Sequence, residues 1–561
     1  MGNADASAGA HGGAKDIRFG TSGYRGRWGI EFTEAVARDI AQAICDFLID
    51  VDQRAGKIVV VGYDSRLHAD TMASWCADVA LQNGFQVHLT ERDTPTPVLS
   101  YYAGDVLGDA CAGVINCTSS HNPVEWQGIK FSLHDGSISP PPVTDFISNR
   151  ATDYRKGERT WRPRELTDED RSRLTSFDPL ASYCDWILEA GNGNCRISLD
   201  HDRMRAYFAD KLVIIDEMHG SARGYLRRIL DEIGVPHEVI HAEKDPNLGG
   251  LHAANPEEPH IQALKDAVRE RGAAIGLGTD TDGDRYGIVD RGGFYVEPNA
   301  ILAMLTRYLG VKRGLTGRVG TTYVTTRILD RIAADIPGNE SHWPLPGALP
   351  MHMADPAYET VLGDPADVAT RHAFMVLTGL KYIIQAAQME PDYRLPKTPP
   401  ADWRCRLLIG GEEASGLTTK GHVPDKDGIW ACLLVLDMMA AYGTSIAEIW
   451  ADLEAAYNPA NYARENLGIP QDRKAGFIDG LIDEARETGS LDGIQVVYAG
   501  TIPGKYAEFR LRAENGSTEN YLQTRPSGTE PYVRVYFETT SPGMLPQLRR
   551  AIEGRIPSGR G

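Results

Sequence analysis

Long apolar runs are missing from this sequence of 561 residues, and none approaches the roughly 20 residues that a membrane-spanning helix needs. Basic residues are also scarce, because 58 Lys and Arg stand against 77 Asp and Glu and give a formal net charge of −19. Proteins that bind nucleic acid carry a basic surplus that neutralises phosphates, so this balance disfavours that class. We expect neither a membrane nor a nucleic acid as a partner.

Closely spaced cysteine pairs are absent too. The eight cysteines are scattered and form no C-x-x-C motif, which argues against a zinc ribbon and against a disulfide framework. This cysteine usage suggests a reducing compartment. Residues 1–15 are rich in Gly and Ala without the apolar core of a signal peptide, so we expect a disordered tail and a cytoplasmic protein.

Two nucleotide-binding signatures are also missing. No G-x-x-x-x-G-K-[ST] segment occurs, and the G-x-G at 276–278 lacks its third glycine. A nucleotide-driven kinase or a dehydrogenase is therefore disfavoured.

Apolar runs of strand length alternate with segments of helical spacing through most of the chain. This alternation predicts parallel sheets flanked by helices, and its recurrence suggests three related α/β units. The strand-like runs include 57–62, 112–116, 211–215, 273–278 and 406–410.

The end of the chain differs from this pattern. Strand-like runs at 494–500, 507–513 and 524–539 lie between two helical stretches and predict a small α+β domain. Residues 135–200 and 337–376 lack clear periodicity, and we interpret them as insertions or long connections.

Small polar residues directly follow the apolar run 112–116. The segment 117–123 reads CTSSHNP, and its Ser120 could act as a nucleophile or be carried as a phosphoserine, with His121 and Lys130 close in sequence. An ordinary Ser/Asn/Pro turn would use the same residue types. The segment by itself leaves both interpretations open.

Three carboxylates alternate in the segment DTDGDR, which directly follows another strand-like run. Oxygen ligands in this pattern suit a hard cation such as Mg²⁺. An EF-hand does not fit, because arginines stand where that loop needs its sixth-position glycine and its final glutamate. A solvated acidic turn is the alternative, but two unit charges about 4 Å apart repel by roughly 4 kcal/mol at an effective dielectric near 20. We therefore predict a metal site at Asp280, Asp282 and Asp284.

Two further loops carry polar side chains. The segment 411–416, GEEASG, offers the Glu412 carboxylate on a turn, where it can accept hydrogen bonds from sugar hydroxyls. The segment 525–531, RPSGTEP, offers the Arg525 guanidinium, two hydroxyls and exposed backbone N–H groups, which suit a phosphate. Each segment has a simpler interpretation, a Gly-Glu turn in the first case and a Pro/Gly hairpin loop in the second.

Together these segments, in this order and at these intervals, resemble the α-D-phosphohexomutase superfamily from Phe19 to about Tyr536. The matching segments are FGTSGYRG, TSSHNPVEWQGIK, DTDGDR, GLKYI, GEEASG, HVPDKDG and RPSGTEPYVRVY. The resemblance implies an α/β protein with three related α/β domains, built on mixed sheets, and a C-terminal α+β domain around a central cleft. We place these domains at residues 16–202, 203–298, 299–455 and 456–561.

The resemblance also implies roles for individual residues. Ser120 would carry a phosphoryl group and would complete the Mg²⁺ site of the three aspartates. Lys130, or else His121, would act as the acid/base, while Arg25 and Arg285 would stabilise negative charge. The implied substrate-binding residues are Lys381, Glu412, Ser415, Arg525, Ser527, Gly528, Thr529 and Arg534.

The function implied by this resemblance is that of a phosphosugar mutase with a bisphosphorylated intermediate and glucose 1,6-bisphosphate as activator. Glucose 1-phosphate and glucose 6-phosphate are the expected pair, chiefly because the sugar loop holds two glutamates. A phosphomannomutase or a dual-specificity enzyme is the first alternative, ahead of a phosphoglucosamine or phosphopentose mutase. Ala414 stands where the family usually has serine, and Gln127 where it commonly has asparagine. A phosphatase and a non-catalytic sugar-phosphate sensor remain open, and the sequence does not indicate an oligomeric state.

Overall fold

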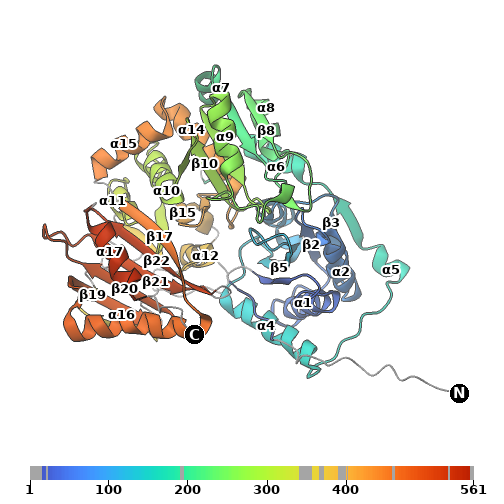
Figure 1. Cartoon of the computed structure of the whole chain (residues 1–561). Helices are drawn as coiled ribbons and strands as arrows, with labels where there is room; N and C mark the ends of the chain where they lie inside the picture. The colour runs from blue at the N-terminus through green and yellow to red at the C-terminus, as the bar shows by residue number, and fades with distance from the viewer. Residues whose placement is uncertain are drawn as a thin grey trace.

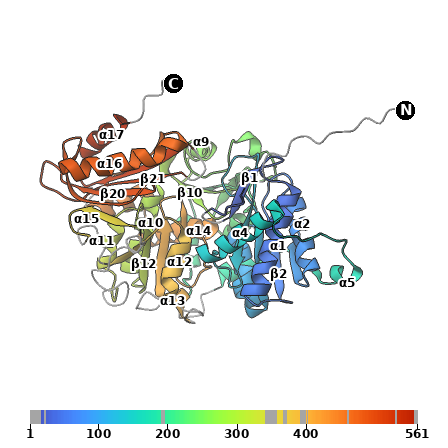
Figure 2. The ribbon, with the colours of Figure 1, turned by 90° about the horizontal axis from the view of Figure 1, so that it is seen from below.

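The computed structural model describes residues 16–20, 23–189, 195–339, 357–365, 372–389, 400, 402–457, 461–527, 531–541 and 543–555. Within this part of the chain, four sheets follow one another in chain order around the molecule (Figure 1). Seen from below, the C-terminal sheet lies beside the elements of the third sheet and away from α1 (Glu34–Asp46) and α2 (Ala69–Gln82) of the first (Figure 2). The predicted fold class, three related α/β domains and a C-terminal α+β domain, is confirmed.

The first sheet has the strand order β1-β5-β4-β2-β3-β6. Strands β4, β2, β3 and β6 are parallel, whereas β5 and β1 run antiparallel to their neighbours. The first helix begins after Thr33, whose hydroxyl accepts from Val36 N, and it buries an apolar face against the sheet. The strands are β1 (Tyr24–Arg27), β2 (Ile58–Tyr63), β3 (Gln86–Thr90), β4 (Cys111–Cys117), β5 (Trp126–Leu133) and β6 (Leu174–Phe177). The helices are α1 (Glu34–Asp46), α2 (Ala69–Gln82), α3 (Thr96–Tyr101), α4 (Pro141–Lys156), α5 (Asp168–Arg171) and α6 (Leu180–Leu188).

The second sheet, β11-β10-β9-β7-β8, repeats this plan with parallel β9, β7 and β8 and an antiparallel β10. Its strands are β7 (Val213–Asp216), β8 (His237–Ile240), β9 (Ile275–Thr279), β10 (Tyr286–Asp290) and β11 (Phe294–Val296). Its helices are α7 (His201–Phe208), α8 (Tyr225–Ile233) and α9 (Gln262–Arg271).

The third sheet, β14-β12-β15-β16, has parallel β14, β12 and β15 followed by an antiparallel β16. Its strands are β12 (Arg318–Thr322), β14 (Ala373–Val376), β15 (Leu407–Glu412) and β16 (Gly416–Thr419). The helices of this region are α10 (Pro298–Thr306), α11 (Ile328–Ala334), α12 (Leu380–Gln388), α13 (Trp403–Arg406), α14 (Gly428–Tyr442) and α15 (Ile446–Tyr457). Almost all of α14 is buried, and it belongs to one hydrophobic core that the second and third sheets share.

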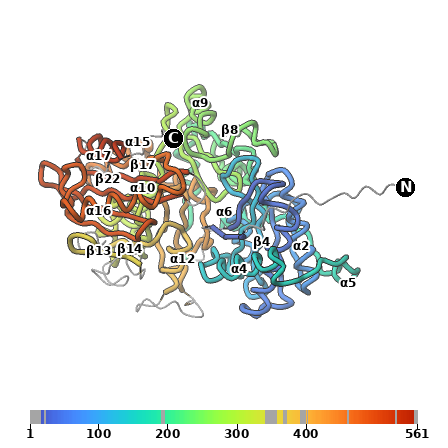
Figure 3. Tube along the Cα trace, turned by 60° about the horizontal axis from the view of Figure 1, so that its bottom comes forward, coloured from blue at the N-terminus to red at the C-terminus, as the bar shows by residue number. Residues whose placement is uncertain are grey.

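The C-terminal sheet is antiparallel, with the order β13-β19-β20-β21-β22-β17 and with β18 paired to β19. Its strands are β13 (Glu359–Leu362), β17 (Asn461–Gly468), β18 (Ser490–Leu491), β19 (Ile494–Ile502), β20 (Tyr506–Leu511), β21 (Asn520–Pro526) and β22 (Tyr532–Thr539). Its helices, α16 (Lys474–Thr488) and α17 (Met544–Glu553), pack against the sheet in a separate core. Figure 3 shows the same separation of this domain from the N-terminal one.

One topological feature recurs in all four domains and positions the candidate site. Each predicted functional loop joins a strand to its antiparallel neighbour: β4 to β5, β9 to β10, β15 to β16 and β21 to β22. In the three α/β domains that first strand is also parallel to the rest of its sheet. The loops therefore leave the carboxyl ends of parallel strands, where open α/β sheets present reactive groups.

The expectation for the two segments without clear periodicity needs correction. The stretches 135–200 and 337–376 are not mere insertions, because β6 extends the first sheet, β14 joins the third and β13 joins the C-terminal one. Strands β6 and β13 are largely exposed, so they lack the apolar run that signals a buried strand.

The cysteines also differ from expectation, since Cys195 and Cys405 form a disulfide with 4.9 Å between their Cα atoms. The two cysteines are 210 residues apart, so their spacing in the sequence does not indicate that they pair. The other six cysteines lie in the described residues, and they are free and buried.

No single helix in the described ranges is long and apolar enough to cross a membrane. Only α14 and α15 taken together, across a 75° bend, reach that length and composition.

Candidate active site

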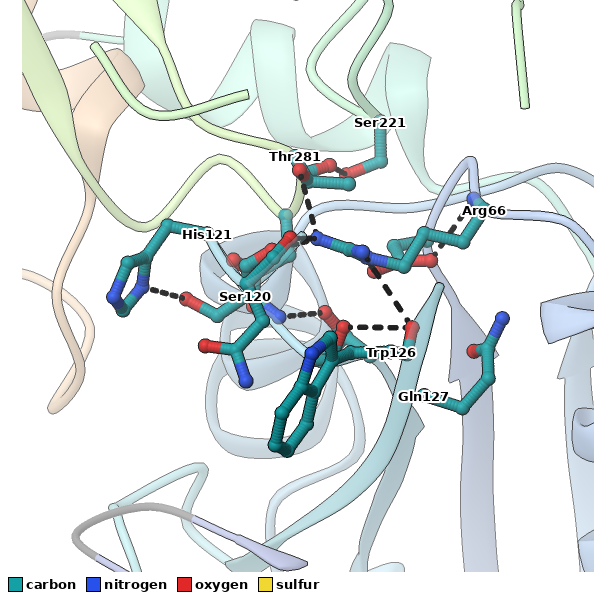
Figure 4. Close-up of polar contacts among 12 residues, drawn as sticks. Arg66, Ser120, His121, Trp126, Gln127, Ser221 and Thr281 are labelled. Atoms are coloured by element: carbon teal, nitrogen blue, oxygen red, sulfur yellow. Dashed lines mark hydrogen bonds and ion pairs between the residues drawn. The ribbon is translucent and has the colours of Figure 1, made fainter. Parts of the chain in front are cut away.

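The serine loop between β4 and β5 holds Ser120 in an unusual backbone conformation. Its φ is +56°, which is uncommon for a residue other than glycine and persists only where the surroundings enforce it. Ser120 N donates to Thr118 Oγ1 at 2.8 Å. From the other side, the Arg66 guanidinium donates to the carbonyl oxygens of Ser120, Asn122 and Pro123 at 2.5, 2.5 and 2.7 Å (Figure 4). Arg66 was not singled out from the sequence, because nothing in its local segment marks it as a partner of a loop 54 residues away.

The Ser120 hydroxyl lies between two candidate functional groups. Its Oγ is 3.3 Å from Asp280 Oδ2. It is also 3.3 Å from His121 Nδ1 (Figure 4). Burial, together with the charges of Arg285 and Arg25, holds the pKa of His121 well below its usual value, so the ring is neutral near pH 7. The structure thus brings together the serine, the histidine and the first aspartate of the acidic loop.

The acidic loop between β9 and β10 gathers Asp280, Asp282 and Asp284, all fully buried, with a carboxylate oxygen of each within 4.8 Å of the others. Burial and the other two carboxylates raise the pKa of Asp280 well above its usual value. Oδ1 of Asp282 and Oδ1 of Asp284 have no hydrogen-bond partner in the described part of the chain. Buried carboxylates with free oxygens suit a hard cation, and with Ser120 Oγ nearby the residues fit Mg²⁺.

Two lysines converge on this acidic loop. Lys130 Nζ, from β5, lies 2.5 Å from Asp282 Oδ2 and 2.7 Å from Asp284 Oδ2. Burial would lower the pKa of Lys130, but the two aspartates raise it above its usual value. Lys426 Nζ lies 2.9 Å from Asp284 Oδ2. Lys426 lies in the HVPDKDG segment, but its local sequence gives it no role, because its proximity to the acidic loop is a tertiary contact.

Two arginines lie beside the acidic loop. Arg285 Nε is 3.9 Å from Asp284 Oδ1, and the Arg285 backbone N–H donates to Asp280 Oδ1 at 3.1 Å. Arg25 comes from β1, the edge strand next to β5, at a position paired with Gly128. Burial lowers the pKa of Arg25, and the carboxylate of Asp282 opposes that shift. Both predicted arginines therefore lie within the electrostatic reach of the aspartates.

The sugar loop between β15 and β16 contains two buried glutamates with different surroundings. Glu412 ends β15, and its pKa is raised by burial, which the nearby Lys426 opposes. Glu413 accepts a hydrogen bond from Tyr536 of β22 at 3.1 Å. Ser415 is fully buried with φ of +61°, and its hydroxyl donates to Glu257 Oε1 at 3.1 Å. The hydroxyl expected to face the sugar is thus already bound to a carboxylate from another domain.

Lys381 lies in the first turn of α12 and is 6% exposed. Burial lowers its pKa, while the charges of Asp145 and Glu412 act in the opposite direction. The charge of Glu412 thus connects Lys381 to the sugar loop.

The predicted phosphate loop begins at Arg525, which is paired across the hairpin with Arg534. Lys474 Nζ donates to the Ser527 carbonyl at 2.7 Å and adds a third cation, which the sequence of the loop itself does not contain. The predictions for Gly528 and Thr529 lie outside the described residues. Among the described residues, no hydrogen bond or ion pair joins Arg525 to the Ser120 loop.

Comparisons with known proteins agree with this arrangement. The family models for phosphoglucomutase/phosphomannomutase match in order: alpha/beta/alpha domain I at residues 16–158, domain II at 183–293, domain III at 360–457 and the C-terminal domain at 509–554. A phosphoglucomutase of Komagataeibacter xylinus is 25% identical over 93% of this chain and 87% of its own length. A phosphoglucosamine mutase of Carboxydothermus hydrogenoformans is 25% identical over 93% of this chain and 94% of its own.

A solved structure shows the same fold. It is the open form of the exocytosis-sensitive phosphoprotein parafusin, a phosphoglucomutase from Paramecium, with a TM-score of 0.70 at 20% identity over 97% of this chain and 96% of that one. Four family models in the expected order, over a fold of the same architecture, show that the chain belongs to the phosphoglucomutase/phosphomannomutase family, and so to the α-D-phosphohexomutases, enzymes that move a phosphoryl group within a sugar phosphate.

Proposed function

We propose that this chain interconverts glucose 1-phosphate and glucose 6-phosphate and that Ser120 carries the phosphoryl group between them. The observation that carries the proposal is the buried Ser120 hydroxyl, 3.3 Å from Asp280 in an acidic loop on which Lys130 and Lys426 converge. A protein that only binds sugar phosphates needs no such acceptor. Glucose is preferred because the sugar loop holds two buried glutamates, Glu412 and Glu413.

Phosphoryl transfer requires positioning and neutralisation of charge more than covalent chemistry by the protein. In the proposed step, an oxygen of the sugar hydroxyl bonds to phosphorus while the bond from phosphorus to Ser120 Oγ breaks. The hydroxyl proton passes to His121, whose ring is neutral near pH 7, and not to Lys130, which is already protonated because its two aspartate partners raise its pKa. Lys130, Arg25 and Arg285 stabilise the negative charge on the phosphoryl oxygens. When bound, Mg²⁺ at the three aspartates and Ser120 would supply further neutralisation of those oxygens.

The sugar is held at two places in this proposal. The phosphate that it already carries docks on Arg525, Ser527, Gly528 and Thr529, with Arg534 and Lys474 adding positive charge. Glu412 accepts hydrogen bonds from ring hydroxyls, and Lys381 contacts the phosphosugar beside it. We assign Ser415 to holding the sugar loop, since its hydroxyl already donates to Glu257.

The second half of the cycle returns the other phosphate. The bisphosphorylated sugar turns over in the site, so that the phosphate first held by Arg525 faces Ser120, and that phosphoryl group passes to Ser120 Oγ. Glucose 1,6-bisphosphate added in trace amounts would therefore activate enzyme that has lost its phosphoserine.

The test is Mg²⁺-dependent conversion of glucose 1-phosphate by purified protein primed with trace glucose 1,6-bisphosphate, with mannose 1-phosphate in parallel. Ser120→Ala should reduce turnover to background and should carry no labelled phosphate. The matched variant Ser119→Ala keeps the acceptor, because the Ser119 hydroxyl donates to the Trp126 carbonyl instead, and it should still be labelled at Ser120.

Other outcomes redirect the proposal. Faster conversion of mannose 1-phosphate would assign a phosphomannomutase, and steady release of inorganic phosphate would assign a phosphatase. Turnover that persists in Ser120→Ala would overturn the phosphoserine mechanism itself.

A further inference from the structure

A single buried carboxylate, that of Glu257, connects three domains. Glu257 precedes α9 in the second domain and is 6% exposed. Its Oε1 accepts from the Ser415 hydroxyl of the sugar loop at 3.1 Å. Its Oε2 lies 2.8 Å from Arg464 Nη2, on the first strand of the C-terminal domain, β17. The sugar loop and the C-terminal domain are thus joined through one side chain that belongs to neither.

The hydrogen bond between Ser415 and Glu257 stabilises a turn whose backbone conformation is unfavourable. Ser415 has φ of +61°, and a residue other than glycine keeps such a conformation only where its contacts enforce it. Ser415 is also held through its backbone, since Tyr286 N donates to the Ser415 carbonyl at 3.2 Å. Glu412 is paired with Gly416 across the same hairpin, so the turn also orients the carboxylate assigned to the sugar.

The bond to Arg464 is difficult to replace. Both groups are largely buried, with side chains 30% and 8% exposed for Arg464 and Glu257. Although burial raises it, the pKa of Glu257 stays below its usual value because Arg464, Arg285 and the Ser415 hydroxyl favour the charged form. Removal of one partner of such a pair leaves a buried charge uncompensated, which costs more than the pair itself contributes.

The segment that carries Glu257 also reaches the serine loop. The His252 carbonyl accepts from Val124 N at 3.2 Å, five residues before the carboxylate that binds Ser415. The segment 252–257 therefore contacts the serine loop, the sugar loop and the C-terminal domain.

We propose that Glu257 is a positioning residue that couples docking of the C-terminal domain to the conformation of the sugar loop, so that Arg525 and Glu412 meet the substrate together. The kinetic consequences rest on the proposed function, but the coupling itself does not. When only a fraction of molecules has the domain docked, the apparent affinity for substrate falls by that fraction. A looser site would also release the bisphosphorylated intermediate more often and would need more added activator.

The first experiment needs no substrate. Hydrogen exchange is measured on the unliganded full-length protein and on Arg464→Gln, and the turn 412–416 is followed along with β17. Arg464 forms no hydrogen bond or ion pair with that turn in the described residues, although the charge of Glu413 acts on it. The coupling therefore predicts that exchange at Ser415 and Gly416, beyond Glu413, rises by about threefold or more. The matched control is Glu519→Gln, which breaks the 3.1 Å pair between Glu519 and Arg331 of α11 and should leave the turn unchanged. Faster exchange confined to β17 would overturn the proposal.

The second experiment uses whichever phosphohexose the wild-type enzyme converts. Arg464→Gln and Ser415→Ala should each raise KM, by about tenfold for the arginine, with a smaller change in kcat and a higher activator requirement. Because both act through Glu257, the double variant should be no worse than the poorer single one, and Arg464→Lys should recover part of the loss. Effects of the two substitutions that multiply would mean that they act independently and would overturn the coupling. A wild-type protein without mutase activity would sink the proposed function, while the exchange result would still decide the coupling.

Discussion

Arg66 donates to the backbone carbonyl of Ser120, the residue whose φ of +56° places its hydroxyl beside Asp280. The same guanidinium reaches two more carbonyls of the serine loop and pairs with the buried Asp64 at 3.3 Å. The planar guanidinium of arginine has several N–H donors and can hold three carbonyls in one geometry, whereas the ammonium group of lysine cannot. The conformation of the serine loop therefore depends on an arginine that lies outside it.

Arg66→Lys should keep the charge next to Asp64 but lose most of the carbonyl contacts. We expect kcat to fall by about 100-fold because the acceptor oxygen is misplaced, with a smaller change in KM. Steady-state kinetics and the rate of Ser120 phosphorylation would measure this. Arg203→Lys, which alters a similar contact to the buried Asp437, should lower the unfolding temperature without lowering kcat. Unchanged kcat in Arg66→Lys would contradict the assigned role.

Mg²⁺ should stabilise the folded protein, since only the fold brings the three buried carboxylates together to bind the ion. At a concentration 100 times its dissociation constant, an ion that binds only the folded state contributes about 2.7 kcal/mol. Asp280→Asn should raise the unfolding temperature in Mg²⁺-free buffer and should abolish the further rise on addition of Mg²⁺. Thermal unfolding at constant ionic strength, with Na⁺ in place of Mg²⁺, provides the measurement. An equal Mg²⁺ response in both proteins would place the metal elsewhere.

Glu217 should make stability depend on pH. Burial raises its pKa from 4.5 to about 6, so folding favours the protonated carboxyl. This contribution is complete below about pH 4.5 and is lost as the pH rises through about 6. At pH 7.5, Glu217→Gln should therefore be more stable than the wild type by about 2 kcal/mol, and the advantage should shrink toward pH 4.5.

Urea unfolding of both proteins across this pH range would show the trend. Glu232→Gln, which changes an exposed glutamate of α8, serves as the control for the loss of one carboxylate at the surface. An advantage of Glu217→Gln that is the same at pH 4.5 and pH 7.5 would show that the carboxyl does not titrate as expected.

Arg525 should contribute to substrate binding more than to the chemical step. Arg525→Gln removes a partly buried guanidinium next to Arg534 and should raise KM for the phosphosugar by about 10- to 100-fold, with a smaller fall in kcat. Arg512→Gln, an exposed change just beyond β20, should leave both constants unchanged. A fall in kcat with KM preserved would assign Arg525 to the transfer step instead.

Much of the candidate site could be predicted from the sequence, because its chemistry is concentrated in short contiguous loops. Ser120 and His121 are neighbours, the three aspartates lie within five residues, and the alternation of apolar runs indicated the α/β class. Contiguous residues share a loop whatever the rest of the chain does, so such motifs survive without tertiary information. The strands β6 and β13 escaped prediction because they are exposed edge strands with little apolar patterning.

What the sequence by itself determined is the set of reactive groups and their order along the chain. Only the tertiary structure decided which distant side chains support these groups. Arg66 donates to the Ser120 carbonyl, Lys426 pairs with Asp284, and Glu257 binds both Ser415 and Arg464. These partners lie 54 to 207 residues apart, and the Cys195–Cys405 disulfide spans 210. No local propensity or periodicity encodes such contacts, because they arise only when distant segments of one domain or of separate domains pack and must satisfy the buried charges and backbone groups they enclose.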